Sequence, residues 1–236
     1  PNREPDGNSV IFAVPAGLVV MDTGRHEWQR QAILALASAQ RQAIVAIVNS
    51  HWHLDHVSGN PTLRAAYSGL QVYASNAIDN ALTGFLAASA KENVTYLGDP
   101  RFPEETRADI RGDLLTIQKG AELKPDVVIS TSGAMLLGGR AFKINLAPNA
   151  ATAGDVWLYD ESSGIAALGD LVTLPAPFLD TACPEGWKAA LAQVAATPFS
   201  IAIPGHGTPM HPKQFLRYRQ AFTTFIDCAR SVRPKD

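Results

Sequence analysis

The chain has 236 residues, of which 46% are apolar and 18% are charged. These proportions are ordinary for a globular protein and exclude a largely disordered chain, and the length suffices for one sizeable domain or two small ones. The formal net charge of -2 provides no basic field, so nucleic acid is not expected as a partner.

Membrane association is not expected either. The most apolar segments, such as residues 43–48, are far shorter than the ~20 residues that a membrane helix needs. The chain opens at Pro1 without a Met, a start compatible with removal of a leader. Two cysteines are too few for a disulfide scaffold; Cys183 and Cys228 pair if the protein is exported and otherwise remain free thiols. A periplasmic or secreted location is slightly favoured, and no oligomeric state is predicted.

The first third of the chain predicts alternating strands and helices. Two apolar runs flank a turn and indicate a hairpin, a helix with one apolar face follows, and an unbroken β-branched run then indicates a strand buried on both faces. Another helix and strand complete this part. In order, these elements are expected over residues 9–14, 17–21, 26–40, 43–48, 61–67 and 70–74.

The rest of the chain changes from helical to β-rich and back. Residues 76–120 are expected to be mostly helical, with a break near residues 98–100. Turn residues separate the strands that follow, and a helix near Trp187 shows the spacing of a core-facing face. The later elements are expected over residues 127–130, 134–137, 141–146, 156–159, 165–168, 187–195, 200–203 and 213–230. Because strands alternate with helices in both halves, without a linker, we expect one α/β domain over residues 1–236.

The most informative segment is Ser-His-Trp-His-Leu-Asp-His at residues 50–56. It places His51, His53, Asp55 and His56 within six residues, and imidazole and carboxylate groups suit zinc and similar divalent ions. A single helix cannot aim all four side chains at one centre, whereas a loop that leaves a strand can. The preceding strand gives this loop a rigid support, so we predict a metal site here.

This segment matches the H-x-H-x-D-H motif of the metallo-β-lactamase superfamily, and four further segments resemble the family's motifs in the family's order. Residues 19–24 end in Asp-Thr-Gly, residues 153–155 are Ala-Gly-Asp, Asp170 follows a glycine, and His206 lies within Pro-Gly-His-Gly. Each later motif is weak alone, but the ordered set extends over residues 9–210. The resemblance implies a four-layer αββα sandwich with metals at one edge, between two sheets.

The resemblance also implies a set of ligands for one or two metal ions, with zinc expected and iron or manganese as alternatives. The first metal position has two imidazole ligands, the second has three ligands of its own, and an aspartate bridges both. In that order, the residues are His51 and His53; Asp55, His56 and His206; and Asp170.

One aspartate and two histidines outside this set can also be interpreted from the sequence. Asp22 is expected to accept a hydrogen bond from a ligand imidazole and fix its tautomer; the alternative is an ordinary residue at a helix N-terminus. His26 and His211 match no motif position and are interpreted as surface residues.

One position departs from the family pattern. Ala151 stands where the family has a histidine, the third imidazole of the first metal position, so that position keeps only His51, His53 and the shared Asp170. Three interpretations remain open: the protein works with one metal, it binds two with water or another side chain in the gap, or Ala151 is an introduced substitution or a sign of decayed activity. Cys183 is a softer candidate for a metal role. We favour a working enzyme whose second position binds more tightly.

The chemistry expected from the resemblance is hydrolysis of a carbonyl-type bond in a small molecule: a β-lactam, lactone, ester or thioester. Asp55 is the candidate catalytic residue, as proton acceptor or relay. Substrate choice is expected to depend on residues 76–120 and on the loop at 173–179, where Phe178 either lines the pocket or simply packs. Trp52 either flanks the pocket or packs beneath it. The alternative function is that of a metal-binding protein without activity.

Overall fold

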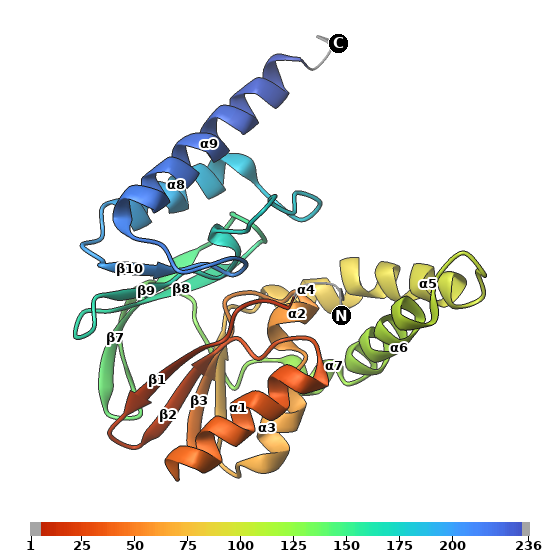
Figure 1. Cartoon of the computed structure of the whole chain (residues 1–236), viewed down its shortest axis with the longest axis horizontal. Coiled ribbons are helices and arrows are strands. Elements are labelled where there is room, and N and C mark those ends of the chain that lie inside the picture. Colours follow the sequence, from red (N-terminus) through yellow and green to blue (C-terminus); the bar gives the residue numbers. More distant parts are fainter. Residues whose placement is uncertain (1–5, 233–236) are drawn as a thin grey trace. The chain divides into compact units, whose positions relative to one another are not determined.

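The computed structural model describes residues 6–232, which form two compact units (Figure 1). The first unit comprises the chain up to residue 130 together with residues 136–140, and the second comprises residues 131–135 and the chain from residue 141 onward. The start at Pro1, on which the idea of a removed leader depends, lies outside the described residues. The single domain expected over 1–236 stays a prediction.

The first unit is built on a five-stranded sheet in the order β1-β2-β3-β4-β5. The hairpin strands β1 (Val10–Val14) and β2 (Gly17–Met21) are antiparallel, with Val10 opposite Met21. The strands β3 (Ile44–Val48), β4 (Gln71–Ala74) and β5 (Val127–Val128) continue the sheet in parallel. The carboxyl ends of β2 and β3 therefore meet at one edge, and the histidine-rich loop leaves the sheet there.

Two helices cover one face of this sheet, α1 (Glu27–Gln40) and α3 (Asn60–Ala66) (Figure 1). Ile33 and Ala37 of α1 and Leu63 of α3 pack with Leu18, Ile47 and other strand residues in one buried apolar cluster. Burying such side chains stabilises the unit by ~2 kcal/mol each relative to exposure. The histidine-rich loop is thus attached to a well-packed sheet.

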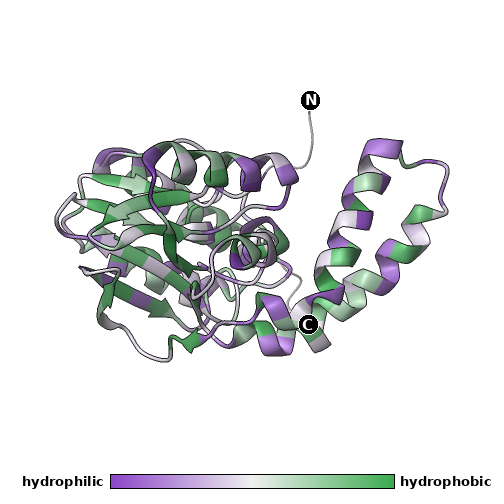
Figure 2. Cartoon of the chain, turned by 90° about the horizontal axis from the view of Figure 1, so that it is seen from below, coloured by the Kyte–Doolittle hydropathy of each residue, from purple (hydrophilic) through white to green (hydrophobic). Residues whose placement is uncertain are grey.

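A helical segment between β4 and β5 comprises α4 (Ala77–Thr83), α5 (Phe85–Leu97), α6 (Glu104–Gln118) and α7 (Gly120–Leu123). We call residues 77–123 the helical insert. In Figure 2 the pair α5 and α6 extends away from the sheet of its own unit, and apolar and polar residues alternate along both helices. Few of their side chains are buried: Leu86 in α5, and Ile110 and Asp113 in α6.

The second unit contains a sheet in the order β10-β9-β8-β7-β6. Two helices, α8 and α9, pack on it through Trp187, Leu191, Phe215 and Phe222, in a cluster that also holds Trp157 of β8. The elements are β6 (Gly133–Leu137), β7 (Arg140–Ala147), β8 (Asp155–Asp160), β9 (Ile165–Ala167), η1 (Gly169–Leu171), α8 (Pro184–Ala195), β10 (Ile201–Ile203) and α9 (Pro212–Ser231).

Every strand and helix expected from the sequence is present, with three differences. The strand expected over residues 127–130 is reduced to Val127–Val128. The segment expected to be a plain loop ends in one helical turn, α2 (Leu54–Val57). The helical part of residues 76–120 is divided into separate helices rather than broken once. No helix between residues 6 and 232 combines the length and the hydropathy that crossing a membrane requires.

Candidate metal centre

The histidine-rich loop begins where β3 ends and is fixed at both of its ends by buried polar contacts. The main-chain N–H of Asn49 donates to the carbonyl of Tyr73 at 2.9 Å, and the Asn60 amide donates to the Asn49 side chain at 2.7 Å. Gly59 lies against Thr23, where any Cβ would come within 2.4 Å of the Thr23 carbonyl oxygen. This close approach explains why the chain returns through a glycine after His56.

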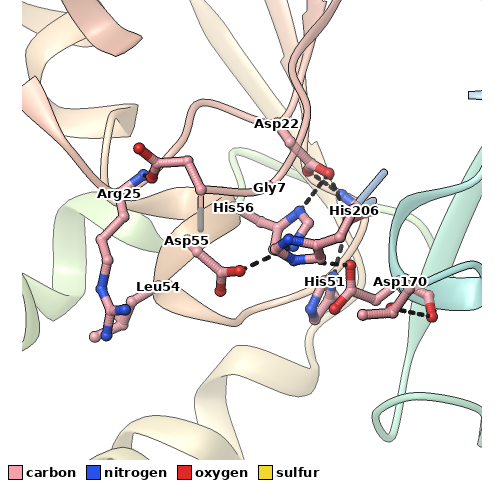
Figure 3. Close-up of polar contacts among 12 residues, drawn as sticks. Gly7, Asp22, Arg25, His51, Leu54, Asp55, His56, Asp170 and His206 are labelled. Carbon is pink, nitrogen blue, oxygen red and sulfur yellow. Dashed lines mark hydrogen bonds and ion pairs between the residues drawn. The ribbon is translucent and has the colours of Figure 1, made fainter. Parts of the chain in front are cut away.

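Asp22 follows β2 directly, and its carboxylate points toward the His56 ring (Figure 3). Its Oδ1 accepts the main-chain N–H of Ser50 at 2.7 Å. Its Oδ2 accepts the Ser50 hydroxyl at 2.6 Å and the Nδ1–H of His56 at 2.8 Å. Its backbone is left-handed, with φ at 61°, a conformation that aspartate tolerates better than most residues. Asp22 precedes α1 by several residues, so it is not the helix N-terminal residue of the alternative interpretation.

These contacts define the tautomers of two imidazole rings. The carboxylate of Asp22 only accepts, so His56 carries its proton on Nδ1, and Nε2 keeps the lone pair that binds metals. The Ser50 hydroxyl has one hydrogen, which it gives to Asp22, so toward His51 Nδ1 at 2.9 Å it must accept. His51 therefore also carries its proton on Nδ1. Asp22 orients His56 directly and His51 through Ser50.

The four ligand-type residues of the loop converge within the first unit. The ring centroids of His51 and His53 are 4.4 Å apart, and those of His51 and His56 are 4.3 Å apart. The helical turn α2 places Asp55 beside His56, with Asp55 Oδ2 3.5 Å from His56 Nε2. Each of the four residues carries a group that is able to hold a metal ion. The sequence predicted this convergence, although not the helical turn.

In the second unit, Asp170 and His206 lie side by side. Asp170 belongs to the turn η1 after β9, and His206 belongs to the loop after β10. Asp170 Oδ1 is 3.5 Å from His206 Nε2, and the Gly205 N–H donates to the Gly169 carbonyl at 2.7 Å. A Cβ at position 205 would lie 2.0 Å from Asp170 Oδ1, so this close packing of the two loops requires a glycine.

The middle motif of the second unit places Ala151 in the packed interior. Ala151 is fully buried in the apolar cluster of this unit, and its carbonyl accepts the Thr181 hydroxyl at 2.9 Å. Asp155 is also buried, and its Oδ2 accepts the Thr152 N–H at 2.8 Å. Burial raises the pKa of Asp155 to about 7, and the charge of Asp170 adds to this effect.

Tyr218 of α9 supports the turn that carries Asp170, a contact that was not predicted from the sequence. Its hydroxyl accepts the main-chain N–H of Thr173 at 3.2 Å, and Thr173 forms a parallel bridge with His206. Burial raises the pKa of the Tyr218 phenol to about 12, so the phenol is neutral at physiological pH. The one sequence feature that indicated burial of Tyr218 was its position in a helix with an apolar face.

Several interpretations of single residues are decided by burial. His26 is only 7% exposed, so its interpretation as a surface residue is wrong, whereas His211 is exposed as expected. Trp52 packs beneath the loop in a cluster with residues of the helical insert. Cys183 and Cys228 are both exposed and free. The N–H of Cys183 donates to the Ala150 carbonyl at 2.8 Å, so its main chain lies beside the middle motif.

Comparison with known proteins gives a clear family. The model of the metallo-beta-lactamase superfamily matches residues 3–206, while no curated protein matches the chain. Among solved structures, a metallo-beta-lactamase from Pontibacter korlensis is 20% identical, with a TM-score of 0.66, and the match covers 92% of this chain and 87% of that one. A protein solved in a di-iron-bound form is 22% identical, with a TM-score of 0.63 and coverage of 90% and 93%.

A third similar structure is a stereoselective inverting sec-alkylsulfatase from Pseudomonas sp., 18% identical with a TM-score of 0.69, where 96% of this chain covers 40% of that one. At these identities the likeness shows the fold, which is the mixed α/β fold of the metallo-β-lactamase type. The family match extends through most of the chain, and the chain therefore belongs to the metallo-β-lactamase superfamily. Its members are mostly metallohydrolases that bind one or two metal ions.

Proposed function

We propose that this chain is a hydrolase that acts on a carbonyl-type bond of a small molecule, with a β-lactam or lactone as the leading substrate class and an ester or thioester next. We assign its ligands to two metal positions. His51 and His53 belong to the first position and Asp55, His56 and His206 to the second, with Asp170 shared. All six residues lie within the part of the chain that matches the family.

The observation that carries this proposal is the fixed tautomer of His56. Its Nδ1–H donates to Asp22, which leaves Nε2 as a ligand atom, in the carboxylate–histidine arrangement common around bound metals. Two ligand atoms at ~2.1 Å from one tetrahedral ion lie ~3.4 Å apart. The 3.5 Å between Asp55 Oδ2 and His56 Nε2 agrees with that separation, as does the 3.5 Å between Asp170 Oδ1 and His206 Nε2.

A bound divalent ion would supply a nucleophile from water at neutral pH and would polarise the substrate carbonyl. The chain's own residues would hold the ion, orient its imidazole ligands and move a proton. Asp22 orients His51 and His56 so that Nε2 of each ring is the ligand atom, and the Asp55 carboxylate accepts or relays a proton as general base. The Asp55 side chain is 22% exposed, so it is accessible to a substrate or to water.

Zinc is the metal that this ligand set favours, since imidazole and carboxylate both suit it. Iron is the first alternative, because one similar fold is solved in a di-iron-bound form, and manganese is the second. Ala151 removes one imidazole from the first position, so we propose that the second position binds its ion more tightly. A protein that binds metal without turnover is the alternative function, and Ala151 is the observation that favours it.

A substrate panel tests the proposal. Purified protein is assayed with lactam, lactone, ester and thioester substrates after loading with zinc, iron or manganese, and His56→Ala is compared with His211→Asn. His211 is exposed and is the N-cap residue that precedes α9, and asparagine is a good N-cap residue, so this control should retain activity. We expect turnover that His56→Ala abolishes. Bound metal without turnover of any substrate would favour the binding protein.

The substitution Ala151→His tests the incomplete position. It supplies the missing imidazole, so we expect a second ion to bind at least about 10-fold more tightly than in the unaltered protein. Ala151→Phe places a ring of similar size there without a ligand nitrogen and serves as the control. Unchanged stoichiometry and affinity in Ala151→His, measured by titration with zinc, would contradict the assignment of this position.

A further inference from the structure

A segment near the N-terminus lies directly on one of the proposed metal ligands. Gly7 packs against the His56 ring so closely that a Cβ would lie 2.4 Å from His56 Cε1 and 2.7 Å from Nε2 (Figure 3). The Gly7 N–H donates to the Asp55 carbonyl at 3.2 Å, and the Gln29 amide donates to the Gly7 carbonyl at 2.7 Å. The ring is thus held between Asp22 on one side and the main chain of Gly7 on another.

The neighbouring Asp6 fixes this segment to the start of α1. Its carboxylate accepts the main-chain N–H groups of Arg25 and His26, at the helix end where a negative charge is favourable. The His26 Nδ1 lies 2.7 Å from Asp6 Oδ2. The Asp6 side chain is only 4% exposed, so this carboxylate depends on these donors in place of water.

The same imidazole also faces the helical insert. His26 Nε2 is 3.4 Å from Asp109 Oδ1 of α6, and Arg25 forms a bidentate pair with Asp113 of α6 at 2.9 and 2.5 Å. The other charged groups nearby are Glu27 and Arg30, which pair with each other at 3.0 Å. His26 is therefore a buried residue that connects three parts of the chain: the segment at Asp6, the N-terminal end of α1, and helix α6.

We propose that His26 is a positioning residue for the metal ligand His56, acting through Asp6 and Gly7. The inference rests on the proposed role of His56 as a ligand. Without the imidazole, a buried carboxylate loses one of its donors, and a buried acceptor left short of partners is costly. Asp6 then moves toward water and draws Gly7 away from the His56 ring. The ligand loop loses one of the surfaces that restrict it.

The experiment compares His26→Ala with His26→Asn. The asparagine amide nitrogen occupies the place of Nδ1 and keeps a donor for Asp6, while alanine removes it. His26 makes no capping hydrogen bond to α1 through its side chain, so the helix start is not the main loss. A second variant, Gly7→Ala, disturbs the ring directly without altering His26. His211→Asn is the matched control at a histidine outside the network.

Two readouts are used, of which one needs no metal. In protein treated with a chelator, amide hydrogen exchange of residues 50–59 should become faster in His26→Ala and in Gly7→Ala, but not in His26→Asn or His211→Asn. In competition with a chromogenic chelator, zinc affinity should fall by about 10-fold or more in the first two variants, and stay close to that of the unaltered protein in the other two.

The outcomes separate the two proposals. If the unaltered protein binds no metal, the proposed function fails, while the exchange experiment still tests His26. If His26→Ala leaves both exchange and zinc affinity unchanged, the positioning role is wrong. If His26→Asn is as impaired as His26→Ala, the donor to Asp6 is not the cause, and the proposal is overturned. Thermal unfolding of each variant confirms that it is folded.

Discussion

Asp22 connects two imidazole rings, those of His51 and His56, through one carboxylate. Oδ2 receives both the Ser50 hydroxyl and the His56 Nδ1–H, and Oδ1 receives the Ser50 main-chain N–H. The rings of His51 and His56 therefore share one source of orientation. A buried carboxylate with three donors is well compensated, so the arrangement persists without a bound ion and prepares the site for one.

Substitution of Asp22 should consequently weaken both metal positions. Asparagine tolerates the left-handed backbone at position 22. However, the neutral amide of Asp22→Asn no longer provides a carboxylate oxygen that accepts from both the Ser50 hydroxyl and the His56 Nδ1–H. We expect zinc affinity to fall by about 10- to 100-fold at both positions. Ser50→Ala interrupts only the link to His51 and should affect mainly the first position. Equal effects of the two variants in a zinc titration would contradict this division.

Asp155 is expected to make stability depend on pH. Its pKa is raised from 3.8 to about 7 in the folded protein, so between these values the unfolded chain releases the proton and the folded chain keeps it. Stability due to this group is complete below about pH 4 and is lost as the pH rises to about 7. The loss amounts to roughly 4 kcal/mol, at ~1.4 kcal/mol per pKa unit.

The substitution Asp155→Asn removes this dependence while its amide oxygen still accepts the Thr152 N–H. In urea unfolding of chelator-treated protein, the free energy of unfolding of the variant relative to the unaltered chain should increase from about pH 4 to about pH 7 and then stay constant. A difference that does not change with pH would show that Asp155 titrates normally.

At this scale, the sequence indicated the histidine-rich loop as a candidate metal site but did not indicate the contacts that support the loop. Four ligand-type residues in one short segment are visible as a pattern, and Asp22 was found because it belongs to a motif. His26 and Gly7 belong to none. The role proposed for them depends on contacts between residues 6–7, 26 and 55–56, which are distant in the chain. The spacing of residues in the sequence does not predict contacts of this kind.

Trp52 links the ligand loop to the helical insert. It packs with Leu54, Ile78, Leu86 and Leu123 in one buried cluster, and its ring lies 4.6 Å from that of His53 and 5.5 Å from that of Phe85. The helical insert is therefore attached through its apolar side to the histidine-rich loop. This explains why a tryptophan stands between two histidines in the motif of this chain.

Trp52→Ala should accordingly destabilise the protein by about 3–5 kcal/mol, because it leaves a cavity in the core between the loop and the insert. Trp28→Ala is the matched control: Trp28 is 61% exposed on α1, and its loss should change stability by less than about 0.5 kcal/mol. The measurement is urea unfolding of both variants. Similar effects of the two substitutions would contradict the role of Trp52 in the core.

The elements themselves were predictable because their signals are local. The hairpin at β1 and β2, the buried strand β3 and the helices α1, α8 and α9 all follow from apolar periodicity. The turn α2 was missed because four residues are too few to show a helical period. The division of the helical insert was also missed, since its helices bury few side chains and therefore show weak patterns.

At the scale of the whole molecule, the proposed ligands are distributed over both units. The first supplies His51, His53, Asp55 and His56, and the second supplies Asp170 and His206. The family match covers all six, and the ordered motifs had already indicated their order along the chain. The third imidazole is absent because residue 151 is an alanine, which packs in the interior of the second unit. Nothing in the rest of the sequence identifies a replacement.

The most direct test of this account is a crystal structure of zinc-loaded protein, with anomalous diffraction recorded on both sides of the zinc absorption edge. We expect an ion within about 2.0–2.2 Å of the side chains of Asp55, His56 and His206, with a weaker or absent second ion near His51 and His53. Zinc bound elsewhere, or no zinc at His56 in well-folded protein, would contradict it.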